Sequence, residues 1–498
     1  MYFERNTPVG RCYAPTPENH PPPAPSGPYT MAKYYTLSDI LAIAKVHPFY
    51  SDTKYPPTRE DLPSVLAASK NDGISVDLKS FPLTKKSTLY QEIARLTADT
   101  NPHNGYRQNT YISTTGGGSG GPPMVFATDS GENRQQRATI GALMRAFRVI
   151  EPGDWVLSMH VSGSFYRALD LTTEICEHAG ASVLCAGPEM AHQAMIDAIV
   201  HYRVNVVAGD AGQVVQLAKY VAALDTSQKG SIRLTKFLYT SEPMTLAQQR
   251  FINSVFGDVL IYSVIGSAEA GPWAVSIPSL TGHTAENYAD FIFDTRTMLL
   301  EVFPLYIEDE DADANHVESA PCVPDGEKGI LVQTSLQRLR NPLVRYVCGD
   351  LASVHPLPQK VHGDLLEEEA QYYKVVRIYG RDRRISFDWY GEYFEFQGIQ
   401  ALMRTEAWGI LQWQVILRHK EDNDMDVLLE VRILRAPHRD GDFINEQELT
   451  RKIKHFFMVF DFNEDLFELI YLSDFDGFVR STTGRKVLNF VDWTHCIN

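Results

Sequence analysis

The residues with the clearest chemical potential form a glycine-rich stretch, Thr114–Pro123 (TTGGGSGGPP), in which five of the six positions from Gly116 to Gly121 are glycine. Backbone without Cβ atoms can approach a ligand closely and turn its N–H groups inward, which is how protein backbones form nests for phosphate. Flanking hydroxyl groups add hydrogen-bond donors. A surface linker would have a similar composition and stays open as an alternative. The candidate phosphate-binding residues are Thr114, Thr115, Gly116, Gly117, Gly118, Ser119, Gly120 and Gly121.

The neighbouring residues exclude two familiar nucleotide-binding loops. The segment GGGSGG satisfies the pattern GxGxxG, but a dinucleotide-binding loop needs a helix to start directly after it. Here Pro122 and Pro123 precede the strand-like run MVFAT. A Walker loop would need Lys followed by Ser or Thr, whereas Gly121 is followed by Pro122. The pattern therefore predicts a strand–loop–strand cradle for a nucleotide phosphate.

The elements that must position this loop follow from the hydrophobic pattern. From Gly131 onward, apolar runs of strand length alternate with amphipathic segments of helix length, which predicts a layered α/β domain. We expect helices over 132–147, 190–202, 213–223 and 245–256, and strands over 181–186, 204–208, 234–240 and 259–265.

The character of the sequence changes after Gly380. Two strand-like runs, 411–420 and 426–434, suggest an antiparallel pair, and a helix over 446–457 and a strand over 466–472 follow, which predicts a small α+β unit. The total of 498 residues exceeds the roughly 250–300 at which a single core stops growing. Residues 14–28 contain seven prolines and suggest an extended arm. The predicted divisions are a proline-rich arm (1–34), a large domain (35–380) and a small mobile C-terminal domain (381–498).

Composition narrows the classes of partner. The net charge of −16 opposes binding to phosphate backbones, so we expect no nucleic-acid partner. No apolar run approaches the roughly 18 residues that span a bilayer, and the N-terminus lacks the features of a signal peptide, so we expect no membrane association. Six cysteines without a CxxC pair fit a reducing compartment. The expected location is the cytoplasm.

The glycine-rich stretch resembles the TTGG-[ST]-[ST]-G-x-P phosphate loop of phenylacetate-CoA ligases and acyl-protein synthetases, which belong to the ANL superfamily of adenylate-forming enzymes. Gly118 replaces a hydroxyl residue of that loop, and Gly121 stands where many relatives have lysine. Further segments resemble this family in the same order along the chain. They are FPLTKKSTL (81–89), SEPMT (241–245), IGSAEAGP (265–272), GILVQTSLQRLRNPLVRYVCGD (329–350), IYGRDRRISF (378–387) and RSTTGRKVLNFVDW (480–493).

The resemblance implies roles for particular residues. Glu269 matches a glutamate that holds Mg²⁺, Asp350 matches an aspartate that binds the ribose, and Arg381 would reach the ribose or phosphate. Lys486 matches the terminal lysine that neutralises charge during adenylation, with Arg485 as the alternate. The remaining implied nucleotide contacts are Ser241, Glu242, Pro243, Gly266, Ser267 and Ala268, and the implied acid-pocket residues are Phe165, Tyr262 and Trp273, for which core packing is the alternative.

The resemblance implies the ANL fold and an AMP-forming acid–thiol ligase that uses ATP, Mg²⁺ and CoA. Such an enzyme activates a small carboxylic acid as its acyl-AMP with release of pyrophosphate, and then transfers the acyl group to the CoA thiol. Transfer to an amine, or to a protein or carrier thiol, stays open. A nucleotide-binding pseudoenzyme also stays open because of the altered positions Gly121, Ala268, Arg383 and Arg485. The sequence leaves undecided the acid, the acceptor and the oligomeric state, a homodimer included.

Overall fold

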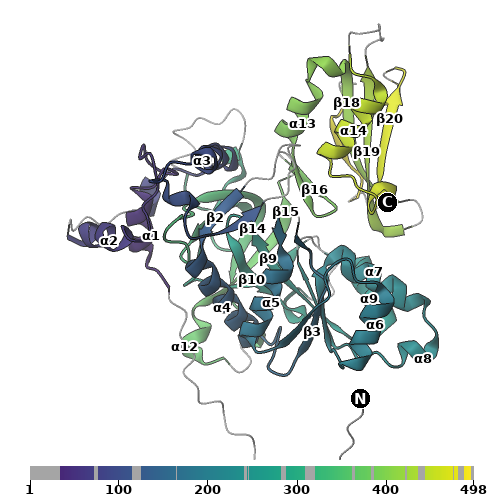
Figure 1. The fold of residues 1–498 in the computed structure, drawn as a ribbon, viewed down its shortest axis with the longest axis horizontal. Helices are drawn as coiled ribbons and strands as arrows, with labels where there is room; N and C mark the ends of the chain where they lie inside the picture. Colours follow the sequence, from purple (N-terminus) through teal and green to yellow (C-terminus); the bar gives the residue numbers. More distant parts are fainter. Residues whose placement is uncertain are drawn as a thin grey trace, which may run out of the picture. The chain divides into compact units, whose positions relative to one another are not determined.

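A computed structural model gives the fold of the chain, in which Tyr34–Asn498 form one compact unit. Figure 1 traces the order of its elements. The residues that the structure describes are 34–71, 77–114, 125–163, 165–240, 244, 246–281, 288–308, 320–361, 365–382, 386–420, 423–435, 443–474, 476–479 and 487–494.

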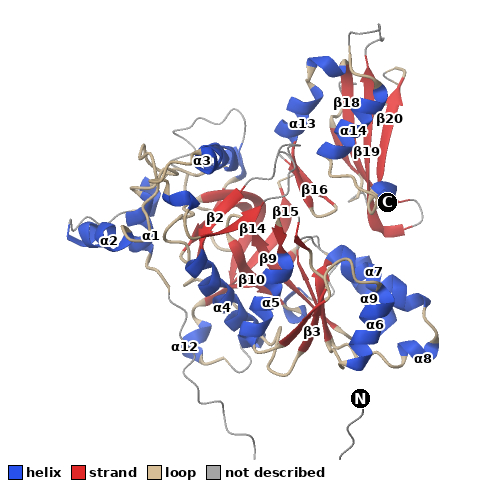
Figure 2. Cartoon of the chain, in the orientation of Figure 1, coloured by secondary structure: helices blue, strands red, loops and turns tan. Residues whose placement is uncertain are grey.

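An eleven-stranded mixed sheet is the largest sheet of this unit, and its strands are drawn as arrows in Figure 2. Five neighbouring strands run parallel, in the order β6-β3-β7-β8-β9. From β9 onward each strand is antiparallel to the next, in the order β10-β11-β15-β14-β13-β12. The predicted α/β class is confirmed. The strands are β3 (Trp155–Ser158), β6 (Ser182–Cys185), β7 (Val206–Asp210), β8 (Lys236–Thr240), β9 (Leu260–Ser267), β10 (Gly271–Ser276), β11 (Ala289–Asp294), β12 (Met298–Phe303), β13 (Gly329–Ser335), β14 (Tyr346–Pro356) and β15 (Tyr373–Arg381).

Helices cover both faces of the parallel strands (Figure 1). In β7, Val206 and Ala208 pack with one helix layer and Val207 packs with the other, as alternation along a strand requires. β7 is thus covered by apolar side chains on both faces, which explains its apolar sequence. One layer contains α4 (Ser130–Ala146) and α5 (Ala168–Ala179), and the other contains α6 (His192–His201), α7 (Ala211–Ala223) and α9 (Leu246–Phe256).

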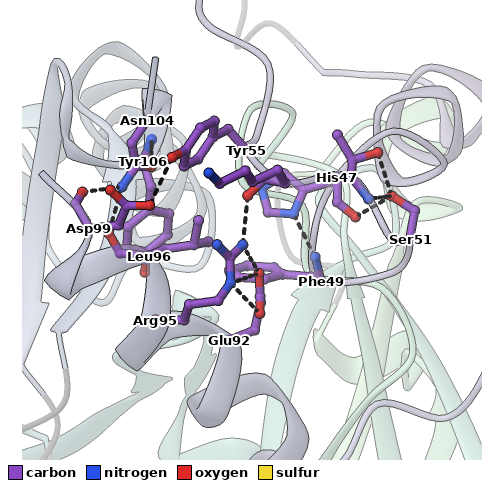
Figure 3. Close-up of polar contacts among 12 residues, drawn as sticks. His47, Phe49, Ser51, Tyr55, Glu92, Arg95, Leu96, Asp99, Asn104 and Tyr106 are labelled. Carbon is purple, nitrogen blue, oxygen red and sulfur yellow. Dashed lines mark hydrogen bonds and ion pairs between the residues drawn. The ribbon is translucent and has the colours of Figure 1, made fainter. Parts of the chain in front are cut away.

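The segment before the sheet is held by polar side chains (Figure 3). The Tyr55 hydroxyl donates to Asp99 Oδ2 at 2.8 Å, and the Asn104 amide donates to the Leu96 carbonyl at 2.6 Å. These bonds fix the C-terminal end of α3, whose N-terminal half reaches the site described below. The elements here are α1 (Leu37–Ala44), α2 (Leu62–Asn71), α3 (Lys86–Ala98), β1 (Thr110–Thr114) and β2 (Val125–Asp129).

The C-terminal part has a sheet and a core of its own. Its four strands have the order β20-β19-β18-β21, and β18 and β19 are antiparallel as the sequence predicts. Apolar residues of this sheet pack against two helices and a hairpin. β15 of the large sheet ends at Arg381. The domain boundary predicted at 380/381 stays a prediction. The elements are β16 (Ser386–Trp389), β17 (Glu392–Glu395), α13 (Phe396–Met403), β18 (Ile410–Lys420), β19 (Asn423–Arg435), α14 (Glu446–Phe456), β20 (Phe467–Leu472) and β21 (Phe490–Asp492).

The remaining short strands and α-helices are β4 (Ser162–Gly163), β5 (Tyr166–Arg167), α8 (Thr226–Lys229), α10 (Pro278–Thr281) and α12 (Glu367–Ala370). Among the helices of the described ranges, none combines the length and the apolar character that crossing a bilayer requires.

Candidate nucleotide-binding site

Two antiparallel strands flank the glycine-rich stretch. β1 ends at Thr114 and β2 begins at Val125, and these two residues face each other across the pair. The strands expected from the sequence are therefore present on both sides of the stretch. Residues 115–121 lie outside the described residues, so their contact with phosphate stays a prediction.

The turn after β9 holds the residues of the second predicted segment. A Cβ atom on Gly266 would lie 2.8 Å from the Pro272 Cα, closer than side chains allow, so the β9–β10 pair needs glycine there. Ser267 Oγ accepts a hydrogen bond from the Ala270 N–H at 3.0 Å, and the buried Gln136 amide of α4 donates to the Ala270 carbonyl at 2.7 Å. These bonds fix the turn that contains Ala268 and Glu269.

Glu269 is a buried carboxylate, with 5 % of its surface exposed. Its Oε1 accepts hydrogen bonds from the Tyr346 hydroxyl at 3.1 Å and from the Tyr90 hydroxyl of α3. Burial alone would raise the pKa of Glu269, but the charge of Lys86 and the two tyrosine donors outweigh it and lower that pKa. The side chain is therefore ionised at neutral pH, which is the state that binds a cation.

Arg338 supports the same turn from the loop between β13 and β14. Its guanidinium, 2 % exposed, donates to the Glu269 carbonyl and lies 5.1 Å from the Phe126 ring centroid. Burial lowers the pKa of Arg338 to about 10, so the group stays charged at neutral pH. The turn thus has a buried cation behind it, which favours a carboxylate at Glu269.

Asp350 and Arg381 face each other across β14 and β15. Arg381 Nη1 lies 3.3 Å from Asp350 Oδ1 and donates to the Cys348 carbonyl at 2.6 Å. Despite the opposing effect of burial, Asp350 and Asp388 raise the pKa of Arg381. The structure thus brings together the two residues predicted to contact ribose and phosphate.

Comparison with known proteins adds to this geometry. No family model matches the sequence, and no curated protein matches it either. A crystal structure of 2-hydroxyisobutyryl-CoA ligase, in complex with 2-HIB-AMP and CoA in the thioesterification state, aligns with a TM-score of 0.60. The identity is 16 %, and the alignment covers 91 % of this chain and 88 % of that chain. The chain has the ANL fold.

Two further solved structures with similarity are more distant. An NRPS protein containing adenylation and PCP domains aligns with a TM-score of 0.49 and 14 % identity, covering 78 % of this chain and 60 % of that chain. Amide bond synthetase McbA from Marinactinospora thermotolerans aligns with a TM-score of 0.47 and 14 % identity, covering 78 % of this chain and 70 % of that chain.

Several residues for which the sequence predicted a role in this ANL fold lie outside the described residues. They are Ser241, Glu242 and Pro243 after β8, and Arg485 and Lys486 near the C-terminus. β8 itself ends at Thr240, so the chain enters the first of these segments at the carboxyl edge of the parallel strands. Ligands of open α/β sheets bind at that edge. The five roles stay predictions.

Phe165 lies next to the glycine-rich stretch. Its carbonyl accepts a hydrogen bond from the Thr114 hydroxyl at 3.0 Å, and its φ of +69° is unusual for a residue with a side chain. The ring is 78 % exposed. It therefore lines no closed pocket in this structure, and its predicted contact with the acid stays untested.

Tyr262 and Trp273 are core residues of the ANL fold. Tyr262 packs with the α4 and α5 layer near the amino end of β9, away from the end that leads to Glu269. Trp273 packs edge-on against Phe293, with ring centroids 6.1 Å apart. Both rings are almost fully buried, so core packing accounts for them. Their role in binding the acid stays a prediction.

His160 was not among the residues predicted for the site. It follows β3 and bridges two strand ends, because its Nδ1 lies 3.2 Å from Ser158 Oγ and its Nε2 lies 2.9 Å from Thr240 Oγ1. Burial lowers the pKa of His160 to about 4, so the ring is neutral at pH 7. A polar residue two positions after a buried strand was the available signal. Lys86, Tyr90, Tyr346 and Arg338 were also missed as contacts of the Glu269 turn.

The residues present fit a magnesium ion. Among the described residues no group of three or more His, Cys, Asp or Glu side chains could hold a metal. Mg²⁺ with a nucleotide needs only one or two carboxylates, because phosphate oxygens and waters complete its six ligands. Glu269, ionised and buried, meets that requirement.

Proposed function

We propose that this protein activates a small carboxylic acid with Mg-ATP as its acyl-AMP, releasing pyrophosphate. The observation that supports it most is Glu269, a buried carboxylate kept ionised by Lys86 and two tyrosine hydroxyls at the end of β9. Burying a charge is costly unless it is compensated, and such sites are often functional. The ANL fold and the Asp350–Arg381 pair add support.

Each residue has one task in this proposal. Glu269 would hold Mg²⁺, which neutralises phosphate charge. Asp350 would accept hydrogen bonds from the ribose hydroxyls, and Arg381 would fix Asp350 and contact phosphate. The loop after Thr114 would hold the β- and γ-phosphates. Lys486, or Arg485 as the alternate, would neutralise the α-phosphate and acyl oxygens.

The reaction needs no covalent bond to the protein. A carboxylate oxygen of the acid attacks the α-phosphorus, and the bond from that phosphorus to the leaving pyrophosphate oxygen breaks. Catalysis would then depend on positioning the reactants and neutralising their charge, which together account for most of the rate enhancement in phosphate chemistry. A neutral His160 beside Thr240 would add polar contacts at the same edge without adding a charge.

The CoA thiol is the acceptor we propose. After adenylation, rotation of the small domain, 381–498, would let the thiol reach the acyl-AMP. The sulfur would then attack the acyl carbon, and AMP would leave. The 2-hydroxyisobutyryl-CoA ligase structure was obtained with an acyl-AMP and CoA. An amine acceptor is the second candidate, as the sequence leaves it open. We further propose that the protein acts in the cytoplasm as a phenylacetate-CoA ligase-like enzyme.

Exchange of labelled pyrophosphate into ATP tests the proposal. A panel of aliphatic, aromatic and amino acids should contain at least one acid that drives exchange, and omission of Mg²⁺ should abolish it. Release of AMP with and without CoA then separates a thiol acceptor from an amine. If no acid drives exchange although the protein binds Mg-ATP, the chain is a nucleotide-binding pseudoenzyme. Light scattering would measure whether it forms the homodimer left open by the sequence.

A further inference from the structure

Tyr393 contacts both cations that neighbour the predicted nucleotide carboxylates. The Lys86 Nζ lies 4.1 Å from the Tyr393 ring centroid, and the Arg381 Cζ lies 4.6 Å from it. Both distances fall within the roughly 6 Å range over which an aromatic ring attracts a cation. Lys86 belongs to α3, Arg381 ends β15 and Tyr393 lies on β17, so one ring joins three elements.

Each of the two cations also neighbours one of the carboxylates. Lys86 Nζ lies 5.3 Å from the ring centroid of Tyr90, and the Tyr90 hydroxyl donates to Glu269 Oε1. Arg381 pairs with Asp350. Two cations beside one ring would repel each other, and the carboxylates together with the negative ring face offset that repulsion.

The backbone next to the ring has a conformation that favours glycine. Gly349 has a φ of +82°, in the left-handed region that favours glycine. A Cβ atom there would lie 3.6 Å from the Tyr393 hydroxyl and 3.8 Å from Arg381 Nη1. The Asp382 N–H donates to the Gly349 carbonyl at 2.9 Å. The ring is thus seated against the segment that precedes Asp350.

We propose that Tyr393 is a positioning residue that couples the Lys86–Glu269 and Arg381–Asp350 pairs during nucleotide binding. The proposal rests on the proposed function. Tyr393 has no direct role in the bond changes. Its ring fixes the positions of the Lys86 and Arg381 charges. Loss of the ring should therefore weaken binding of Mg-ATP more than it slows turnover at saturating nucleotide.

Tyr393→Leu removes the ring face and should raise the KM for Mg-ATP about tenfold, the scale of two cation–ring contacts, with kcat within about threefold. Tyr393→Phe keeps the ring and should recover most of that loss. Tyr471→Leu is a matched control, because Tyr471 is a half-buried tyrosine of β20 whose hydroxyl lies 3.0 Å from Thr450 Oγ1. It should leave the KM for Mg-ATP unchanged.

A double-mutant cycle with Lys86→Met tests the coupling itself. If the ring and Lys86 act as a pair, the effects on KM should fall short of additive by at least about threefold. Additive effects, or an unchanged KM in Tyr393→Leu, would overturn the assignment of Tyr393 while wild-type exchange leaves the proposed function intact. Absence of both exchange and nucleotide binding in the wild type would instead overturn the proposed function and this inference together.

Discussion

Glu269→Gln isolates the charge of one side chain with almost no change of shape. Both tyrosine hydroxyls donate to a single oxygen, Oε1, and the amide oxygen of glutamine can accept both bonds. A hydrogen bond to a neutral acceptor is about half as strong as one to a charged acceptor, so two such bonds weaken by roughly 1–3 kcal/mol in total. Relief of the burial cost of the charge offsets part of this loss.

The effect on catalysis should be larger than the effect on folding. Loss of one preorganised charged group costs about 10²–10³ in rate, or roughly 2.7–4 kcal/mol. We therefore expect Glu269→Gln to lower acid-dependent pyrophosphate exchange by about 10²–10³ and to shift the free energy of unfolding by less than about 2 kcal/mol. The measurements are exchange kinetics across a Mg²⁺ titration and urea unfolding.

Tyr90→Phe is the matched comparison, because it removes one donor to Oε1 and keeps the carboxylate. It should lower exchange by about tenfold at most, the scale of one hydrogen bond to a charged group. A Glu269→Gln enzyme within threefold of wild type, or one no less active than Tyr90→Phe, would show that the charge of Glu269 does not contribute to the reaction.

Three more outcomes are expected. Lys486→Ala should impair adenylation more than Arg485→Ala, and the reverse order in pyrophosphate exchange would transfer the terminal-lysine role to Arg485. The folded-state pKa of His160, about 4, lies below its ordinary 6.5, so acid favours the unfolded state. Stability is lost as pH falls below 6.5, by about 2 kcal/mol between pH 7 and 5, and His160→Asn should flatten that part of the unfolding profile; an unchanged slope would contradict it. Arg340 Nη1 is 3.1 Å from Asp129, and both are buried. Arg59 Nη2 also lies 3.1 Å from Asp129 Oδ1, but its side chain is 54 % exposed. Arg340→Met should lower the free energy of unfolding by about 3 kcal/mol in urea, and Arg59→Met by less than about 1 kcal/mol; equal effects would refute the ranking.

Hydrophobic periodicity in the sequence was enough to predict much of the layered fold. The apolar run predicted as a buried strand over 204–208 appears as β7 (Val206–Asp210), which is covered on both faces, and the helix predicted over 190–202 appears as His192–His201. The antiparallel strand pair after Gly380 could also be predicted from the sequence, because long strand-like runs separated by a short polar segment are typical of such a pair. The same physics explains why the flanks of the glycine-rich stretch were expected to be strands.

Contacts between distant segments could not be read from the sequence. The run QRLRNP looks like a polar surface turn, yet Arg338, Arg340 and Asn341 are buried, because their partners lie far away in the chain. Nothing local distinguishes a solvated arginine from one that meets a carboxylate across the fold. Likewise, an aromatic residue such as Tyr262 is placed on a strand by its neighbours, but the layer that it faces depends on the tertiary fold.

The loop between β13 and β14 also bears on synthesis of the chain. Asn341 Oδ1 lies 3.1 Å from His47 Nε2 across 294 positions, and Arg340 donates to the Gly105 carbonyl across 235 positions. A nascent polypeptide that has not yet emerged past this loop leaves those buried partners exposed to water. The segments around His47 and Gly105 therefore complete their native contacts only after residue 341 has been synthesised, and we expect fragments that stop earlier to be substrates for chaperones and proteases.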